Sequence, residues 1–238
     1  MCNVWRQRRP AVAGCRISDS GSRLVLRLPA LTVAGVLLAA GNSRRMGRAK
    51  ALLPYRGTTL LDHAADLLVA SGCRPRFVVV GPEVEKSCWS RKEQDLEVLV
   101  NADSGAGMAS SLRAALRAIE ASAEVRARGQ GLADGDVIDG VLITLADQPL
   151  VTAEHLAALL AAGRETGLAA TAWAQAFGPP TYLHRAFFPQ LNDLEGDEGA
   201  KKVLAANRDR LRLVTFPGAA FDIDDPDDYA RLLSGEYA

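Results

Sequence analysis

Residues 33–54, VAGVLLAAGNSRRMGRAKALLP, join a short uncharged run to a loop that is rich in glycine and in cations. The aliphatic residues 33–39 predict a strand buried on both faces of a parallel sheet. Gly41 and Gly47 allow the backbone of the following loop to come close to a ligand. The cations of this loop are Arg44, Arg45, Arg48 and Lys50. Cations and backbone N–H groups at the exit of a buried strand are suited to binding polyphosphate.

Two widespread phosphate-binding motifs do not fit this loop. The P-loop requires Gly-Lys-Ser/Thr after four intervening residues, and Met46-Gly47-Arg48 breaks that pattern. The dinucleotide fingerprint requires Gly-x-Gly-x-x-Gly, and Gly41-Asn42-Ser43 breaks it at the second glycine.

Predicted strands and helices alternate along the rest of the chain. Strands are expected at residues 33–39, 77–81, 96–100, 137–145, 169–174 and 211–216, and helices at 59–70, 108–120, 152–162, 197–207 and from 226 onward. Thr59 with Asp62, and Asp225 with Asp228, have the spacing of helix-capping pairs. Repeated β-α-β units predict an α/β fold, a three-layer α/β/α sandwich with a mainly parallel sheet.

The composition limits the classes of partner. The chain has 238 residues, with 28 Lys+Arg and 28 Asp+Glu, so no overall charge favours nucleic acid or an anionic membrane. The longest apolar stretch, residues 28–41, is too short to span a bilayer. The four cysteines show neither a CxxC pair nor metal-ligand spacing, which indicates reduced thiols and a cytoplasmic protein.

The first 30 residues differ from the remainder. They are rich in arginine, contain Asp19 as their single acid, and show no helical or strand periodicity before Arg23. We expect a disordered extension, followed by one domain over residues 31–238. A transit peptide is an alternative, because such peptides are rich in arginine and serine and poor in acids.

Acidic residues follow two of the predicted strands. Asp147 comes directly after the strand at residues 137–145 and is followed by Pro149, so its carboxylate should point rigidly into the crevice at the strand ends. Mg²⁺ takes one or two such carboxylates together with phosphate oxygens and water. A capping role is the simpler alternative for Asp147.

A second acidic cluster lies at residues 222–228. We expect Asp222 and Asp224 to lie on opposite sides of an extended segment, one reaching the metal and the other fixing a backbone turn. Charges that offset the dipole of the last helix are the expected role of Asp225, Asp227 and Asp228.

The string Leu38-Ala39-Ala40-Gly41-x-Ser43-x-Arg45-Met46-Gly47-x-x-Lys50 resembles the signature loop of the MobA-like NTP transferases. Within that family it is most similar to the molybdenum cofactor cytidylyltransferases, and the resemblance extends over about residues 33–233. It implies a Rossmann-like fold of the nucleotide-diphospho-sugar transferase type. The segment Asp222-Ile223-Asp224-Asp225-Pro226 resembles the family's Asp-Ile-Asp-Thr-Pro, which makes Asp222 the better second metal ligand and Asp224 the alternative.

The resemblance also implies an activity. CMP would move from CTP to the terminal phosphate of a molybdopterin-type cofactor, with release of pyrophosphate and with Mg²⁺ as cofactor. The implied catalytic residues are Arg45, Lys50 and Asp147, and the implied metal ligands are Asp147 and Asp222. The implied nucleotide-binding residues are Leu38, Ala39, Ala40, Gly41, Ser43, Gly107 and Ser110. Ala40 matches the cytidylyl-transferring members, whereas guanylyl-transferring relatives have glycine there.

Several features keep other interpretations open. The resemblance makes the hydroxyl of Ser110 or of Ser111 a candidate for contacting the ribose, the base or the second substrate. A plain N-cap role is the alternative for Ser110. Gly178-Pro179-Pro180 departs from the Gly-His-Pro turn that faces the acceptor in the family, so another small phosphate is an alternative acceptor. The Gly105-Ala106-Gly107 string begins a dinucleotide fingerprint, and some MobA-like relatives are described as NAD(P)-dependent oxidoreductases. A molybdoenzyme as recipient of the product is implied by the family alone.

Because residues 1–30 lack apolar periodicity, we predict that their removal leaves the domain folded. The melting temperature should change by less than about 2 °C, the shift expected for less than roughly 1 kcal/mol in a chain of this size. Thermal melts of the full chain and the truncated chain, followed by circular dichroism, provide the measurement. Insoluble truncated protein would contradict the prediction.

Overall fold

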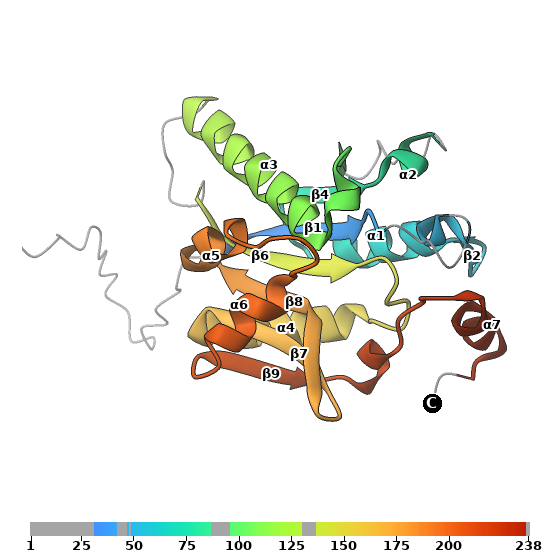
Figure 1. Ribbon diagram of the computed structural model, residues 1–238. Helices are drawn as coiled ribbons and strands as arrows, with labels where there is room; N and C mark the ends of the chain where they lie inside the picture. Colours follow the sequence, from blue (N-terminus) through green and yellow to red (C-terminus); the bar gives the residue numbers. More distant parts are fainter. Residues whose placement is uncertain (1–30, 42–46, 48, 87–95, 130–136, 237–238) are drawn as a thin grey trace, which may run out of the picture.

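A central sheet of seven strands, in the order β5-β4-β1-β6-β8-β7-β9, organises the computed structural model (Figure 1). The structure describes residues 31–41, 47, 49–86, 96–129 and 137–236. The predicted extension, residues 1–30, lies outside them. The strands are β1 (Thr32–Ala39), β4 (Arg76–Val80), β5 (Leu96–Val100), β6 (Ile138–Leu145), β7 (Leu168–Trp173), β8 (Ala176–His184) and β9 (Leu211–Thr215).

Most neighbouring strands are parallel, as the alternating pattern predicted. β1 pairs in parallel with both β4 and β6, β4 with β5, and β7 with β9. β8 runs antiparallel between β6 and β7. The carboxyl ends of β1, β4 and β6 therefore lie together at one end of the strands, on the right in Figure 1.

Helices cover both faces and complete the predicted three layers. The helices are α1 (Leu60–Ala70), α2 (Pro82–Lys86), α3 (Met108–Gly129), α4 (Ala153–Thr166), α5 (Phe188–Asn192), α6 (Ala200–Ala206) and α7 (Pro226–Ser234). Helices α3, α5 and α6 pack on the face to which Val36 of β1 points. Helices α1 and α4 pack on the opposite face with Leu37. This alternation buries β1 on both sides, which explains its uncharged sequence.

The boundaries differ from the sequence-based expectation in a few places. The strand β8 and the short helices α2 and α5 were not predicted. β8 was missed because Pro179 and Pro180 within it indicate against a strand. The helix expected at 197–207 begins only at Ala200, after Gly199 as N-cap, and the helix expected at 108–120 continues to Gly129. Both predicted capping pairs, Thr59 with Asp62 and Asp225 with Asp228, form capping boxes.

A third apolar cluster holds the C-terminal helix, α7, against residues 53–60. It contains Leu53, Tyr55, Leu60, Phe221, Ile223 and Leu232. The small hairpin of β2 (Pro54–Tyr55) and β3 (Thr58–Thr59) forms one side, and the hydroxyl of Tyr229 donates to the Pro54 carbonyl at 2.6 Å. The segment before α7 is therefore fixed beside the carboxyl ends of β1 and β6.

Among the described residues, no helix is both long and apolar enough to cross a membrane.

Tyr182 of β8 is fully buried under α4, against a helical glycine. A Cβ atom at Gly163 would lie 2.7 Å from the Cγ atom of the Tyr182 ring, which is too close for van der Waals contact. Burial raises the pKa of the Tyr182 phenol to about 12. The ring is therefore a neutral core side chain whose position depends on the missing side chain at residue 163.

We predict that Gly163→Ala destabilises the fold by about 1–3 kcal/mol, although alanine favours helices, because the ring has to shift within a packed core. Urea denaturation measures the free energy of unfolding. Gly105→Ala is the matched control, since no atom lies within 4 Å of its added Cβ. A Gly163→Ala protein as stable as the original would show that the ring moves freely.

Candidate active site

A cavity of about 230 Å³ opens at the carboxyl ends of β1, β4 and β6. Residues 38–41 border it after β1, residues 81, 83 and 84 after β4, and residues 145–147 after β6. Ligands of open α/β sheets bind at this edge, because the strand ends there present loops and helix N-termini. The remaining lining residues are Ala49, Lys50, Ala51, Ser104, Gly107, Met108, Ser111 and Asp197.

Among the described residues that line the cavity, Lys50 carries the positive charge. Its Nζ donates to Asp147 Oδ2 at 2.6 Å, to the Ile223 carbonyl at 2.9 Å and to Asp224 Oδ1 at 3.2 Å. Burial by itself lowers the pKa of Lys50, but the neighbouring carboxylates of Asp147 and Asp224 outweigh it, so the net pKa is raised. The lysine is therefore a permanent positive charge at physiological pH.

The two carboxylate oxygens of Asp147 differ in their hydrogen bonding to the described residues. Oδ2 accepts from Lys50, whereas the buried Oδ1 makes no hydrogen bond to any described residue. A buried carboxylate oxygen without a donor is costly unless a cation or a ligand satisfies it. Asp147 therefore fits the role of a divalent-metal ligand.

Asp222 lies close to Asp147 but is not among the residues lining the cavity. The residue is exposed as a whole, but its carboxyl group is partly shielded from solvent. This desolvation and the negative charge of Asp147 raise the pKa of Asp222 to about 6. Two carboxylates that repel each other at short range are suited to sharing a divalent cation. No group of three or more metal-binding side chains occurs within the described ranges.

The expected placement of Asp222 and Asp224 on opposite sides of their segment is wrong. Phe221 and Ile223 are buried, whereas Asp222 and Asp224 are both exposed, so the two acids share the outer side. Residues two apart in an extended chain point to the same side, and the apolar cluster takes the other side. The backbone turn before α7 is held instead by the Asp225 and Asp228 side chains.

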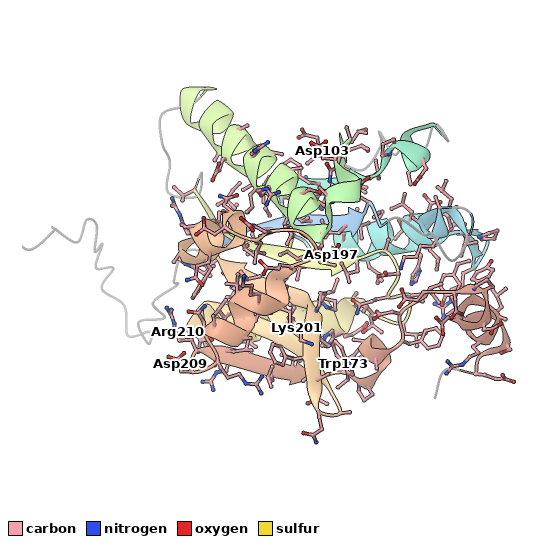
Figure 2. The ribbon with its side chains drawn as sticks, in the orientation of Figure 1. Asp103, Trp173, Asp197, Lys201, Asp209 and Arg210 are labelled. Atoms are coloured by element: carbon pink, nitrogen blue, oxygen red, sulfur yellow. The ribbon has the colours of Figure 1, made fainter. Side chains whose placement is uncertain are left out.

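The N-terminus of α3 forms another wall of the cavity. Gly107 has a φ of 97°, and an added Cβ there would overlap the backbone of Gly196. The loop that carries Asp197 therefore packs directly on Gly107. In Figure 2, Asp103 and Asp197 mark this side of the molecule.

The predicted nucleotide residue Ser110 points away from the cavity. Its buried hydroxyl accepts from Asn101 Nδ2 at 2.8 Å and lies 2.7 Å from the Gly107 carbonyl. Ser110 supports the loop, and Ser111 is the serine of this pair that lines the cavity. Ser110 is the third residue of α3 and not its N-cap.

The structure brings most of the other predicted site residues together. The cavity is lined by Leu38, Ala39, Ala40, Gly41, Lys50, Gly107 and Asp147. Ser43 and Arg45 lie outside the described residues. The cavity lining also includes residues that were not predicted, among them Gly81, Glu83 and Ser104. The end of the strand at 77–81 could have drawn attention to the first two.

Known proteins resemble this chain over most of its length. The family model described as MobA-like NTP transferase domain matches residues 35–211. The Purine catabolism protein PucB of Bacillus subtilis is 32% identical over 207 residues, which cover 82% of this chain and 93% of PucB. Nicotine blue oxidoreductase of Paenarthrobacter nicotinovorans is 29% identical over 217 residues, which cover 87% and 98%.

Two further matches are informative. A probable molybdenum cofactor guanylyltransferase of Mycobacterium tuberculosis is 52% identical over 52 residues, 21% of this chain and 25% of that protein. The crystal structure of Rv0371c of Mycobacterium tuberculosis in complex with manganese has a TM-score of 0.63 and 29% identity, and the match covers 86% of this chain and 98% of that one.

We predict that Asp147→Asn weakens Mn²⁺ binding at least about 10-fold, the smaller effect seen when a group supporting a metal is lost. The amide keeps the shape of the side chain but removes the charge that attracts the metal. Isothermal titration with Mn²⁺, without nucleotide, measures the affinity. Asp209→Asn is the control. Asp209 lies just before β9, at the end of the strands opposite the cavity (Figure 2). Unchanged Mn²⁺ affinity in Asp147→Asn would exclude this residue as a ligand.

Proposed function

The chain belongs to the MobA-like NTP transferase family, and we propose that it is a Mg²⁺-dependent cytidylyltransferase. In this proposal it transfers CMP from CTP to the terminal phosphate of a molybdopterin-type cofactor. The observation that carries the proposal is the Lys50–Asp147 pair at the cavity, in which one carboxylate oxygen has no hydrogen-bond partner among the described residues. Phosphate transfer requires such adjacent positive charge and metal-binding oxygen.

The proposed reaction is a single displacement at phosphorus. A terminal phosphate oxygen of the acceptor forms a bond to the α-phosphorus of CTP, while the bond to the β-phosphate oxygen breaks and pyrophosphate leaves. Lys50 offsets the negative charge that grows on the α- and β-phosphates, together with Arg45. Asp147 and Asp222 would hold Mg²⁺, which would supply neutralisation of the negative charge that develops during transfer.

The nucleoside has its own proposed contacts. The backbone of residues 38–41 borders the base, Ser43 contributes to the same loop, and Gly107 with Ser111 faces the sugar or the second substrate. Ala40 favours cytosine through its resemblance to the cytidylyl-transferring members. GTP is the competing nucleotide, because a probable guanylyltransferase is similar over a short segment.

The proposed acceptor follows from the family resemblance. Gly178-Pro179-Pro180, which differs from the family's Gly-His-Pro, lies within β8 and does not line the cavity. A Cβ atom at Gly178 would lie 3.0 Å from the Trp173 ring. A molybdopterin-type phosphate is favoured by the family resemblance. A molybdoenzyme is the proposed recipient of the product.

A second candidate function is NAD(P)-dependent oxidation or reduction, since nicotine blue oxidoreductase is similar over nearly its whole length. It would use the Gly105-Ala106-Gly107 string. The lack of a side chain at Gly107 is already explained by its packing against Gly196. An oxidoreductase also gives no reason for an acid beside Lys50, so we favour nucleotidyl transfer.

We also propose a reducing, cytoplasmic setting. Cys73 is a free, buried thiol whose pKa is raised by burial, which is typical of an inert core cysteine. The other three cysteines lie outside the described residues.

We predict that CTP with Mg²⁺ stabilises the protein more than GTP, ATP or NADPH. At a ligand concentration about 100 times the dissociation constant, binding should add roughly 2.7 kcal/mol to the free energy of unfolding. Thermal shifts measure this, and EDTA should abolish the effect because it would remove the metal that Asp147 and Asp222 would hold. Pyrophosphate release on adding molybdopterin cofactor and CTP tests the transfer itself. A shift selective for GTP would indicate guanylyl transfer, and one selective for NADPH would indicate the oxidoreductase.

A further inference from the structure

Two of the acceptors around Lys50 come from the far end of the chain. Nζ contacts the Ile223 carbonyl at 2.9 Å and Asp224 Oδ1 at 3.2 Å, across 173 and 174 residues of sequence. Asp147 Oδ2 is another acceptor. An ammonium group has three N–H donors, and these acceptors offer one partner to each.

The segment that carries these acceptors is fixed from both sides. The Ile223 amide donates to the Asp147 carbonyl at 3.0 Å, which ties the segment to the end of β6. The Asp224 amide donates to Asp228 Oδ2 at 3.0 Å, which ties it to the first turn of α7. Ile223 itself is fully buried in the apolar cluster. The backbone at Asp224 is therefore fixed, although 62% of its side chain is exposed.

A lysine side chain needs such a support if it is to act at one place. It has four rotatable carbon–carbon bonds, and a misplacement of about 1 Å can cost on the order of 100-fold in rate. Asp147 alone does not define the direction of the ammonium, because a single contact permits rotation about it. The additional contacts to Ile223 and Asp224 fix the ammonium on the Oδ2 side.

We propose that Asp224 is the positioning residue of Lys50 and that it is not a metal ligand. It holds the ammonium against Asp147 Oδ2, and Asp147 Oδ1 remains for the metal. Lys50 and the metal would then use different oxygens of the Asp147 carboxylate, so both would contribute positive charge next to the phosphates. This division of roles rests on the proposed function, in which Lys50 faces the α- and β-phosphates.

Asp224 should affect the catalytic rate and not the stability of the fold. An ion pair with a largely exposed partner contributes little to folding. Removal of the Asp224 charge should therefore leave the fold intact and change only the placement of Lys50. A merely structural acid would show the opposite pattern.

The first test compares Asp224→Asn with Asp222→Asn and with the control Asp227→Asn, an exposed acid on the first turn of α7. For Asp224→Asn we expect kcat to fall on the order of 10-fold, KM for the NTP to stay within about twofold, and Mn²⁺ affinity to remain unchanged. Asp222→Asn should weaken Mn²⁺ binding, and Asp227→Asn should change neither quantity. A loss of Mn²⁺ affinity in Asp224→Asn equal to that in Asp222→Asn would overturn the proposal.

A double-mutant cycle tests whether Asp224 acts through the lysine. In a Lys50→Met background, Asp224→Asn should cause no further loss of kcat, since the group that it positions is absent. Asp224→Glu, which keeps the charge, should recover part of kcat. An equal loss in both backgrounds would show that Asp224 acts independently of Lys50 and would overturn the proposal.

A third measurement does not depend on nucleotidyl transfer. Limited acylation of lysines, followed by peptide mass spectrometry, should label Lys50 several-fold more in Asp224→Asn than in the original protein. Lys202, an exposed lysine that pairs with Glu198, serves as internal standard. Increased labelling without any CTP-dependent activity would reject the proposed function and retain the positioning contact. Unchanged labelling of Lys50 would overturn the inference itself.

Discussion

Parallel pairing of β1 with β6 is the constraint on which the site depends. It places the end of the first strand beside the end of β6, and the Ala146 amide continues the pairing by donating to the Leu38 carbonyl at 3.1 Å. Lys50 and Asp147 are 97 residues apart in sequence, yet they form a 2.6 Å ion pair because both follow these neighbouring strands. The sheet thus determines where positive charge and metal-binding oxygen meet.

The C-terminal segment completes the site through apolar packing. Ile223 and Leu232 join Leu53 and Leu60 in one cluster, which places Asp222 and Asp224 beside the lysine. The acids at the start of α7 have separate tasks, since Asp225 caps the helix and Asp228 holds the Asp224 amide. Burial of a few aliphatic side chains therefore supports an arrangement of charges that would otherwise repel one another.

The same edge of the sheet explains which predictions about the site agree with the described geometry. Residues 38–41, Lys50 and Asp147 follow strands that a simple hydrophobic pattern identifies, and they line the cavity. Ser110 belongs to the predicted helix, but its hydroxyl turns inward to Asn101 and Gly107. The direction of one side chain on a helix depends on its neighbours in space, and the sequence pattern does not contain them.

The sequence by itself determined the α/β class, the mainly parallel sheet, both capping boxes and the family, because these follow from local periodicity and from motifs of fixed spacing. Only the tertiary structure decided that β8 runs antiparallel through two prolines between β6 and β7. It also decided that Asp222 and Asp224 share one side of their segment and that Asp224 contacts Lys50. Such contacts join residues far apart in the chain, and they arise from the register of strands and the burial of apolar side chains, which no short stretch of sequence specifies.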